Sequence, residues 1–155
     1  MKIKLYFWAA AALLIMILIF WFSSQTAEES GELSGAVTEG TFGNFNISES
    51  IMETAEVLVR KTAHLFIFAV LGFCAANAVR QMTDNPRYIF LSSLILGSFY
   101  GAVDEWHQYF VPGRACMWQD WLIDTLGVLL GIGVSFMIAG FIKKFKNKRV
   151  RIGNA

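Results

Sequence analysis

The sequence is short of charge, proline and cysteine. Only 16% of its 155 residues are Asp, Glu, Lys or Arg, whereas soluble domains carry about 25% charged residues. So few charges cannot cover the surface of a water-soluble domain of this length, and two cysteines cannot staple a small secreted module. These shortages exclude a soluble enzyme, a disordered chain and a disulfide-rich scaffold. At this length a single domain is expected.

Long apolar runs are what the sequence has instead. Hydrophobic residues make up 55% of it, and a helix needs roughly 20 mostly apolar residues to cross a bilayer core about 30 Å thick. Four runs approach that length with at most one charged residue each: 5–22, 63–79, 88–103 and 121–142. We therefore predict an all-α integral membrane protein, a single domain over 1–155 built as a four-helix bundle. The second and third runs are short, so flanking turns must lengthen them.

The net charge of +1 hides an asymmetry along the chain. We take the first run as an uncleaved helix, because it is longer than a signal-peptide core and a poor cleavage site follows it. One side of the spans then holds ten bases and one acid (+9), and the other holds three bases and eleven acids (−8). Cytoplasmic loops are enriched in Lys and Arg, so we expect both termini, with the basic tail 143–155, in the cytoplasm. Nothing in this charge distribution indicates a nucleic-acid partner.

The connections between the runs differ in kind. The turn signal Asp84-Asn85-Pro86 makes the second and third runs an antiparallel hairpin. The outer segment 23–61 is rich in Gly, Ser, Thr and Asn in its middle, and we expect that part to be mobile. From Asn46, which resembles a helix cap with Glu49, the pattern becomes helical. We predict an amphipathic helix over 48–61 near the outer surface. A helix that simply lengthens the second span fits equally well.

Four groups of polar residues lie within or beside the outer ends of the runs. They are Ser23-Ser24-Gln25; Arg60, Lys61 and His64; Asp104, Glu105, His107 and Gln108; and Arg114, Asp120 and Asp124. Ionisable groups near hydrocarbon are costly, so they usually face a bundle interior or a water-filled cavity. The four groups therefore predict one polar pocket that opens outward at the depth of the outer leaflet.

Helical spacing indicates where two of these groups point. Gly97, Gly101, Glu105 and Gln108 recur at spacings of four, four and three, with Asp104 beside them. The acids thus continue a face of small residues that lets helices approach closely, and they should point into the bundle. A second stripe in the fourth run has the same form: Asp120, Asp124, Gly127 and Gly131.

Two explanations fit these residues. As a structural device, the three outer bases pair with the four acids and pin the bundle together. As a functional site, the same residues bind an anionic lipid headgroup, a cell-wall precursor or a divalent metal. Carboxylates with His can hold Zn²⁺ or Mn²⁺, although no His-Glu-x-x-His spacing is present. A serine nucleophile, Ser23 or Ser24 activated by His64 or His107, is a further alternative, but it lacks a nucleophile elbow.

Taken in order, the polar groups resemble the motifs of the VanZ-like family of bacterial membrane proteins. The matching segments are Phe22-Ser23-Ser24-Gln25, Arg60-Lys61-x-x-His64 with Leu71-Gly72, Asp104-Glu105-x-His107-Gln108-x-Phe110-Val111-Pro112-Gly113-Arg114, and Asp120-x-x-x-Asp124-x-x-Gly127. The resemblance extends from Phe22 to about Gly131. One position departs from the pattern. Similar sequences often carry an acidic-aromatic pair where this chain has Ile67-Phe68, so a role that rests on that acid does not carry over.

The resemblance implies a small multi-spanning protein of the bacterial cytoplasmic membrane. It implies lowered susceptibility to the glycopeptide teicoplanin, while a general envelope role fits equally well. The expected partner, a membrane lipid or cell-wall precursor, follows from the polar residues and not from the resemblance. The expected ligand-binding residues are Ser24, Gln25, Arg60, Lys61, His64, Asp104, Glu105, His107, Gln108, Arg114, Asp120 and Asp124.

A second hypothesis is a membrane-embedded, metal-dependent enzyme that acts on a lipid-linked substrate. His64, Glu105 and Asp120 then serve as acid, base or metal ligands. A transporter is disfavoured, because the sequence has no inverted repeat and no charge in the cytoplasmic half of any run.

Overall fold

A computed structural model describes residues 2–43 and 48–153 of the chain. Its regular elements within those ranges are five α-helices and no strand, which confirms the predicted all-α class. The helices are α1 (Lys2–Ser23), α2 (Ala27–Phe42), α3 (Glu49–Arg80), α4 (Pro86–Gln108) and α5 (Trp118–Gly153).

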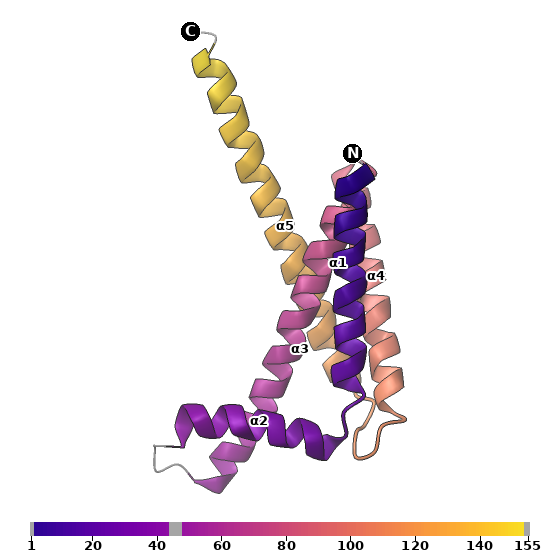
Figure 1. The fold of residues 1–155 in the computed structure, drawn as a ribbon, viewed down its shortest axis with the longest axis vertical. Coiled ribbons are helices and arrows are strands. Elements are labelled where there is room, and N and C mark those ends of the chain that lie inside the picture. The colour runs from indigo at the N-terminus through magenta and orange to yellow at the C-terminus, as the bar shows by residue number, and fades with distance from the viewer. Residues whose placement is uncertain (1, 44–47, 154–155) are drawn as a thin grey trace.

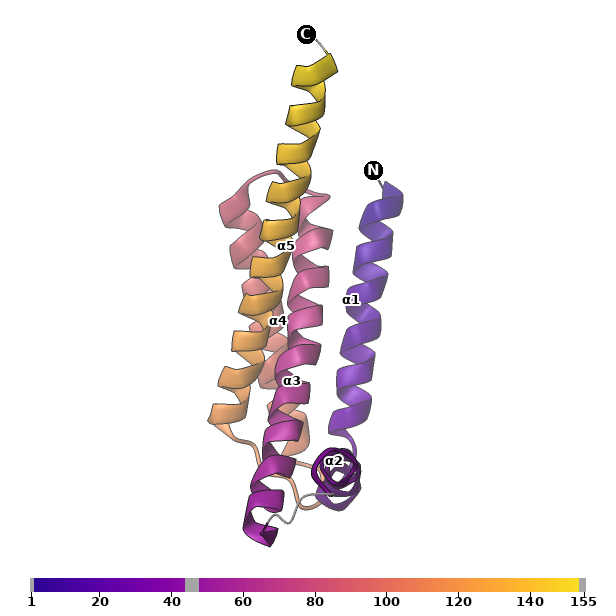
Figure 2. The ribbon, with the colours of Figure 1, turned by 90° about the vertical axis from the view of Figure 1, so that its left-hand side faces the viewer.

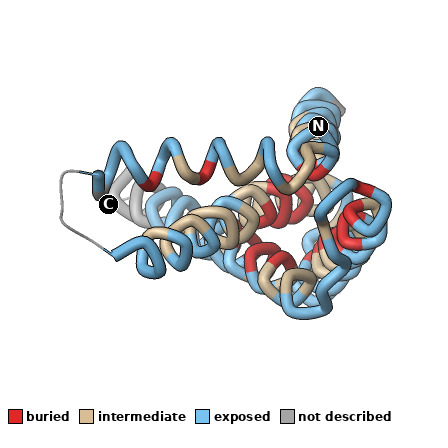
Figure 3. Tube along the Cα trace, turned by 90° about the horizontal axis from the view of Figure 1, so that it is seen from below, coloured by how far each residue is buried: buried red, intermediate tan, exposed pale blue. Residues whose placement is uncertain are grey.

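Four of the helices run lengthwise and one lies across their end. Figures 1 and 2 show α1, α3, α4 and α5 along the long axis, with α2 crossing below the end of α1 and beside the first turns of α3. Helix α3 is central, since it packs against each of the other four. Both ends of the described chain lie at the end of the bundle opposite α2 (Figure 1). Seen from the α2 end, the buried positions of the long helices gather where the helices face one another, while α2 is mostly exposed (Figure 3).

Three helices are long and apolar enough to cross a membrane: Ile3–Ser23, Glu49–Arg80 and Trp118–Asn147. Large apolar side chains on their outer faces stay exposed, among them Phe7, Phe66 and Phe141, and exposed apolar surface on this scale is typical of contact with lipid. The chain is therefore a multi-pass membrane protein. The predicted third run, 88–103, lies inside α4, which is not among these three helices.

Helix α2 forms within the segment 23–61, whose middle was predicted to be mobile; residues 44–47 of that middle lie outside the described residues. Its first turn carries a capping box: the Thr26 hydroxyl accepts from the Glu29 amide at 3.2 Å, and Glu29 Oε2 accepts from the Thr26 amide at 2.8 Å. Two acids in the first turn also stabilise the helix, because their negative charge lies at the positive end of the helix dipole. Ser34 and Thr38 are buried on the side that packs against α3. The glycines that suggested a mobile loop are carried within this helix.

We expect Thr26→Ala to loosen the start of α2, because loss of a cap costs about 1 kcal/mol of helix stability. Hydrogen exchange of the amides in the first turn of α2 should rise several-fold. The bonds to Thr26 lower the pKa of Glu29. Their contribution is therefore present above the usual carboxyl pKa and is lost as the pH falls through the lowered value. Unchanged exchange in Thr26→Ala would contradict the capping box.

Helix α3 decides between the two alternatives for residues 48–61. It runs without a break from Glu49 to Arg80, so this segment lengthens the second span and is not a separate surface helix. The physical reason is local, since no glycine or proline occurs between Glu49 and Leu71. Ser48 occupies the cap position without a side-chain capping bond. The predicted cap, Asn46, lies outside the described residues.

The turn between α3 and α4 forms as predicted. Asn85 caps α4, its side chain accepting from the amides of Arg87 and Tyr88 at 3.0 and 3.4 Å, and Pro86 occupies the first helical position. In the middle of α4, the Ser98 carbonyl accepts from Trp121 Nε1 at 2.9 Å, which ties α4 to α5. The hairpin and this tie fix how α4 is rotated in the bundle.

The contact between α3 and α5 is the closest in the bundle. Val128 and Ile132 of α5 are buried in one cluster with Phe68 and Leu71 of α3. A β-carbon placed on Gly131 would lie 1.8 Å from the Ala69 carbonyl oxygen. The two backbones meet at this point, so the second predicted stripe does face a neighbouring helix.

Candidate functional site

The four predicted polar groups meet at the α2 end of the bundle. Helix α1 ends there at Ser23, α3 passes through with Arg60 and His64, α4 ends at Gln108, and α5 begins at Trp118. A cavity of about 350 Å³ opens between them. Its lining includes seven of the predicted residues: Arg60, Lys61, His64, Glu105, Gln108, Arg114 and Asp120.

The acids of α4 point into the bundle, as the stripe predicted. Asp104 and Glu105 are each only 3% exposed, and Gly97, Gly101 and Gln108 are buried with them. A β-carbon on Gly101 would lie 3.2 Å from the β-carbon of Asp124, which places the acidic stripes of α4 and α5 against each other.

Asp104 is held by hydrogen bonds from two buried side chains. Its Oδ2 accepts from the Ser23 hydroxyl and from Gln108 Nε2, both at 2.9 Å. The Ser24 hydroxyl donates to the Phe20 carbonyl at 2.7 Å. Both serines of the predicted nucleophile thus have other partners, and neither is bonded to a histidine in the described part of the chain. The serine-nucleophile alternative therefore gains no support.

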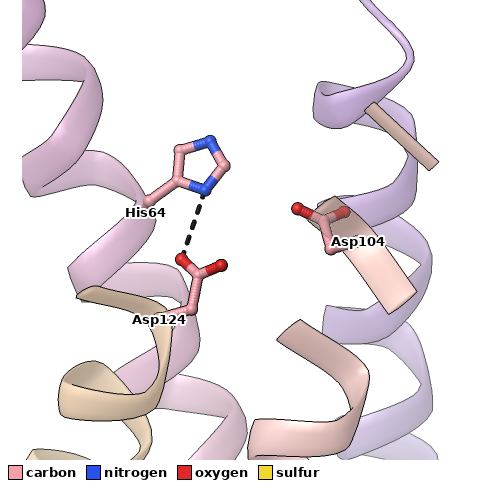
Figure 4. A group of neighbouring side chains, drawn as sticks. All are labelled: His64, Asp104 and Asp124. Carbon is pink, nitrogen blue, oxygen red and sulfur yellow. Dashed lines mark ion pairs between the residues drawn. The ribbon is translucent and has the colours of Figure 1, made fainter. Parts of the chain in front are cut away.

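His64 faces a space that it shares with two buried aspartates (Figure 4). Its Nδ1 is 3.4 Å from Asp124 Oδ1, and Asp124 is completely buried. His64, Asp104 and Asp124 each offer an atom able to bind a metal, and these atoms all lie within 4.8 Å of one another. Figure 4 shows the imidazole and the two carboxylates around one space, each from a different helix. The enzyme hypothesis grouped His64 with Glu105 and Asp120, whereas the structure groups it with Asp104 and Asp124.

The predicted network of ion pairs forms only in part. Lys61 pairs with Asp120, and both side chains are about one-third exposed. Glu105 Oε2 accepts from the Met117 amide at 2.8 Å, just before α5. Within residues 2–43 and 48–153, Arg60 and Arg114 form no ion pair with any carboxylate. The two arginines therefore line the cavity without a direct ion pair, and Asp104 and Glu105 act on Arg114 only at longer range.

Arg114 is positioned by neutral acceptors. Its Nε donates to the Gln25 carbonyl at 3.1 Å, and its Nη1 donates to Gln108 Oε1 at 3.3 Å. Burial, and then the nearby Arg60, lower the pKa of Arg114, although a guanidinium stays protonated in proteins. Arg114 thus ties the linker between α1 and α2 to the end of α4 while keeping its charge.

Five of the twelve predicted residues are outside the cavity lining: the buried Asp104 and Asp124 described above, and Ser24, Gln25 and His107. The exposed Ser24 bonds within its own helix turn. The His107 ring lies 4.4 Å from the ring of Phe20, between centroids, on the side of α4 that faces α1. Gln25 contributes its backbone carbonyl to Arg114, and its side chain borders a second cavity described next.

An apolar groove adjoins the polar cavity, and the sequence analysis missed it. It has a volume of about 280 Å³ between α1, α2 and α3, with Ile19, Phe22, Leu33, Val37 and Ile67 among its lining. Arg60, His64 and Arg114 line both spaces. The groove was missed because α2 was expected to be mobile. The available signal was Thr26-x-x-Glu29 followed by apolar residues at helical spacing in Leu33 and Val37.

Comparison with known proteins gives one match. The sequence model of the VanZ/LLP1 family matches residues 8–139, a range that runs from α1 into α5 and includes every polar group of the site. No curated protein and no solved structure matches the chain.

Proposed function

The chain belongs to the VanZ/LLP1 family, and we propose that it binds the phosphate-bearing headgroup of an anionic lipid, or of a lipid-linked cell-wall precursor, in the cavity at the α2 end. The observation that carries this proposal is the pair Arg60 and Arg114, which line the cavity without a carboxylate partner in the described part of the chain.

The proposed topology has four spans: α4 in addition to α1, α3 and α5. Helix α4 is 23 residues long, or about 35 Å at 1.5 Å per residue. Its outer face carries the exposed side chains of Leu91, Ile95 and Phe99, while Ser93 and Gly97 are buried on the opposite face. This division suits a helix that lies between lipid and the bundle. The positive-inside rule then places both termini in the cytoplasm and the cavity on the outer side of the bacterial membrane.

Arginine suits this site for a geometric reason. Its planar guanidinium presents parallel N–H donors that match two oxygens of a phosphate. Lys61, the third base at the cavity, is already paired with Asp120, so its charge is largely compensated. An anion in the cavity would meet the two arginines from different parts of the chain, Arg60 on α3 and Arg114 after α4.

The apolar groove favours a lipid over a free anion. It shares Arg60, His64 and Arg114 with the polar cavity, so one molecule can place its phosphate at the arginines and an acyl or prenyl chain between α1 and α2. Burying an apolar chain contributes roughly 0.8 kcal/mol per methylene group. A water-soluble phosphate would forgo that contribution.

The test measures binding of dioctanoyl phosphatidic acid to the purified protein in a neutral detergent. Charge-assisted hydrogen bonds contribute about 1.5–3 kcal/mol, so Arg60→Gln should weaken binding by about tenfold or more. The matched control is Arg87→Gln, at the start of α4 and the other end of the bundle, which should bind like the unchanged protein.

Two further ligands separate the sources of affinity. Dioctanoyl phosphatidylcholine should bind more weakly than phosphatidic acid, because its headgroup has no net negative charge. Inorganic phosphate should also bind more weakly, because it leaves the groove empty. Equal affinities for all three ligands, or an equal loss in Arg60→Gln and Arg87→Gln, would overturn the proposal.

The proposed cellular consequence is lowered susceptibility to teicoplanin, which the family resemblance implies. Expression of the chain in a susceptible Gram-positive host should raise the teicoplanin concentration needed to stop growth. Arg114→Ala should abolish this rise while the protein still accumulates in the membrane. If Arg114→Ala fails to accumulate, the hydrogen bonds from Arg114 to Gln25 and Gln108 are its main role.

A further inference from the structure

The strongest unexplained feature is the set of buried carboxylates around His64. His64, Asp104 and Asp124 come from α3, α4 and α5, and their candidate ligand atoms lie within 4.8 Å of one another. In Figure 4 the two carboxylates and the imidazole face a common space. Each of the three residues comes from a different helix. The geometry of the site is therefore set by the packing of these helices and not by a loop.

Apart from its ion pair with His64, Asp124 lacks the hydrogen bonds that a buried carboxylate requires. It is 0% exposed, and neither of its oxygens has a hydrogen-bond donor in the part of the chain that the structure describes. His64 Nδ1 also has no hydrogen-bond partner there, and it stands 3.4 Å from Asp124 Oδ1. Burying an unpaired charge is costly. A group able to contact both residues would remove that cost.

The bases at the cavity do not supply the missing partner. Lys61 is paired with Asp120, and Arg114 donates to Gln25 and Gln108. Two buried carboxylates therefore share one imidazole, which leaves an excess of negative charge in the core. A divalent cation carries the charge that this arrangement lacks.

We propose that His64, Asp104 and Asp124 bind a divalent transition-metal ion, Zn²⁺ or Mn²⁺. Both ions accept imidazole nitrogen and carboxylate oxygen, with bonds of about 2.0–2.2 Å for zinc. Ligand atoms around a tetrahedral ion lie about 3.3 Å apart. The His64–Asp124 separation of 3.4 Å already meets that spacing, and the candidate ligand atom of Asp104 lies within 4.8 Å of both.

The surroundings of Asp104 resemble an outer shell that orients a metal ligand. Ser23 and Gln108 both donate to its Oδ2 and fix the carboxylate plane. Such hydrogen bonds hold first-shell carboxylates in many metal sites. Ser23 and Gln108 come from α1 and α4, so the proposed site involves all four lengthwise helices.

Three protein ligands leave one coordination position open. Sites of this kind bind water or substrate at the fourth position, whereas structural zinc sites are closed by four protein ligands. His64 lines both the polar cavity and the apolar groove, so the open position faces the space that the arginines border. An oxygen of a bound phosphate can occupy it. The metal inference itself does not depend on lipid binding.

The experiment uses the full-length protein with its affinity tag removed, stripped with a chelator and dialysed against ZnCl₂ or MnCl₂. Metal content is measured by plasma mass spectrometry, and Mn²⁺ affinity by electron paramagnetic resonance. We expect one ion per chain. Asp124→Asn keeps the shape of the side chain and should weaken metal binding by about tenfold or more. Loss of an outer-shell contact already weakens metal binding by that much, and loss of a ligand should weaken it at least as far.

Asp84→Asn is the matched control, because Asp84 is an exposed aspartate in the turn between α3 and α4, at the other end of the bundle. It should retain the ion. Should Asp124→Asn fail to fold, the unchanged protein still gives an answer, since an ion that binds only the folded state raises the melting temperature. Arg60→Gln separates this inference from the proposed function, because it should lose the lipid and keep the metal.

The inference is overturned by either of two results. One is an unchanged protein that binds no stoichiometric Zn²⁺ or Mn²⁺ and shows no rise in melting temperature. That outcome assigns the set to a shared proton between Asp104, Asp124 and His64. The other is an equal loss of metal in Asp124→Asn and Asp84→Asn, which would place the ion elsewhere.

Discussion

Gly131→Ala should destabilise the protein more than any other single methyl addition to α5. The new β-carbon would lie 1.8 Å from the Ala69 carbonyl oxygen and 2.7 Å from the Phe73 backbone nitrogen. Both are backbone atoms of α3, so no side chain can rotate away and the helices must separate. Overpacking costs typically 1–3 kcal/mol, and we expect about 3 kcal/mol or more here. Thermal unfolding in detergent should show a large fall in melting temperature.

The same helix provides controls for this prediction. Gly133 and Gly140 have no atom within 4 Å of the position that a β-carbon would take. Alanine at either position should be neutral or stabilising, because glycine inside a helix costs up to about 1 kcal/mol relative to alanine. If Gly131→Ala melts like Gly133→Ala, the close contact of α3 with α5 is wrong.

Gly113→Val should have the second largest effect, and it should reach the site as well as the fold. Gly113 has a φ of +75°, the one positive value in the described chain. An L-residue with a side chain pays roughly 1–2 kcal/mol in this region, and β-branched residues fit it worst. A β-carbon there would also lie 2.9 Å from that of Ala27, the first residue of α2.

Displacement at Gly113 moves Arg114, the next residue, and the start of α2. The Pro112 carbonyl accepts from the Ala27 amide at 3.3 Å, so the loop and α2 are joined at this point. We expect Gly113→Val to lower the melting temperature and to weaken binding of dioctanoyl phosphatidic acid by about tenfold, in line with the loss of one charge-assisted contact.

A graded series tests the cause. Asparagine tolerates positive φ better than alanine or valine. The losses of melting temperature and of lipid binding should therefore be smallest for Asn, larger for Ala and largest for Val. Gly40→Ala, on α2 with open space around it, is the control and should change neither property. Equal losses in all three Gly113 variants would indicate a steric cause alone, without a contribution from backbone strain.

The sequence was sufficient for the elements whose signal is local or periodic. The apolar runs gave α1, α4, α5 and the second half of α3 because a bilayer imposes a length that a hydrophobic count detects. The turn at Asn85-Pro86 followed from residue type alone. The burial of Asp104 and Glu105 followed from their spacing relative to Gly97 and Gly101.

Partners of side chains were harder to predict than their depth. The sequence placed three bases and four acids together, but which pairs form depends on the rotation of each helix, and that is set by contacts such as Gly131 against Ala69. Lys61 therefore meets Asp120, while Arg60 and Arg114 meet no acid in the described residues. Helix α2 was not predicted, because the glycine content of the segment was given more weight than the capping box at its start.

The origin of the site in distant parts of the chain has a consequence for biosynthesis. Lys61 is synthesised before its partner Asp120, which follows 59 residues later, and His64 is synthesised before Asp124 on the last helix. While the ribosome is still making α5, Lys61 and His64 are therefore without these partners. Insertion of α5 is thus the step that completes the core, and a nascent chain arrested before Trp118 should be the form most exposed to membrane proteases.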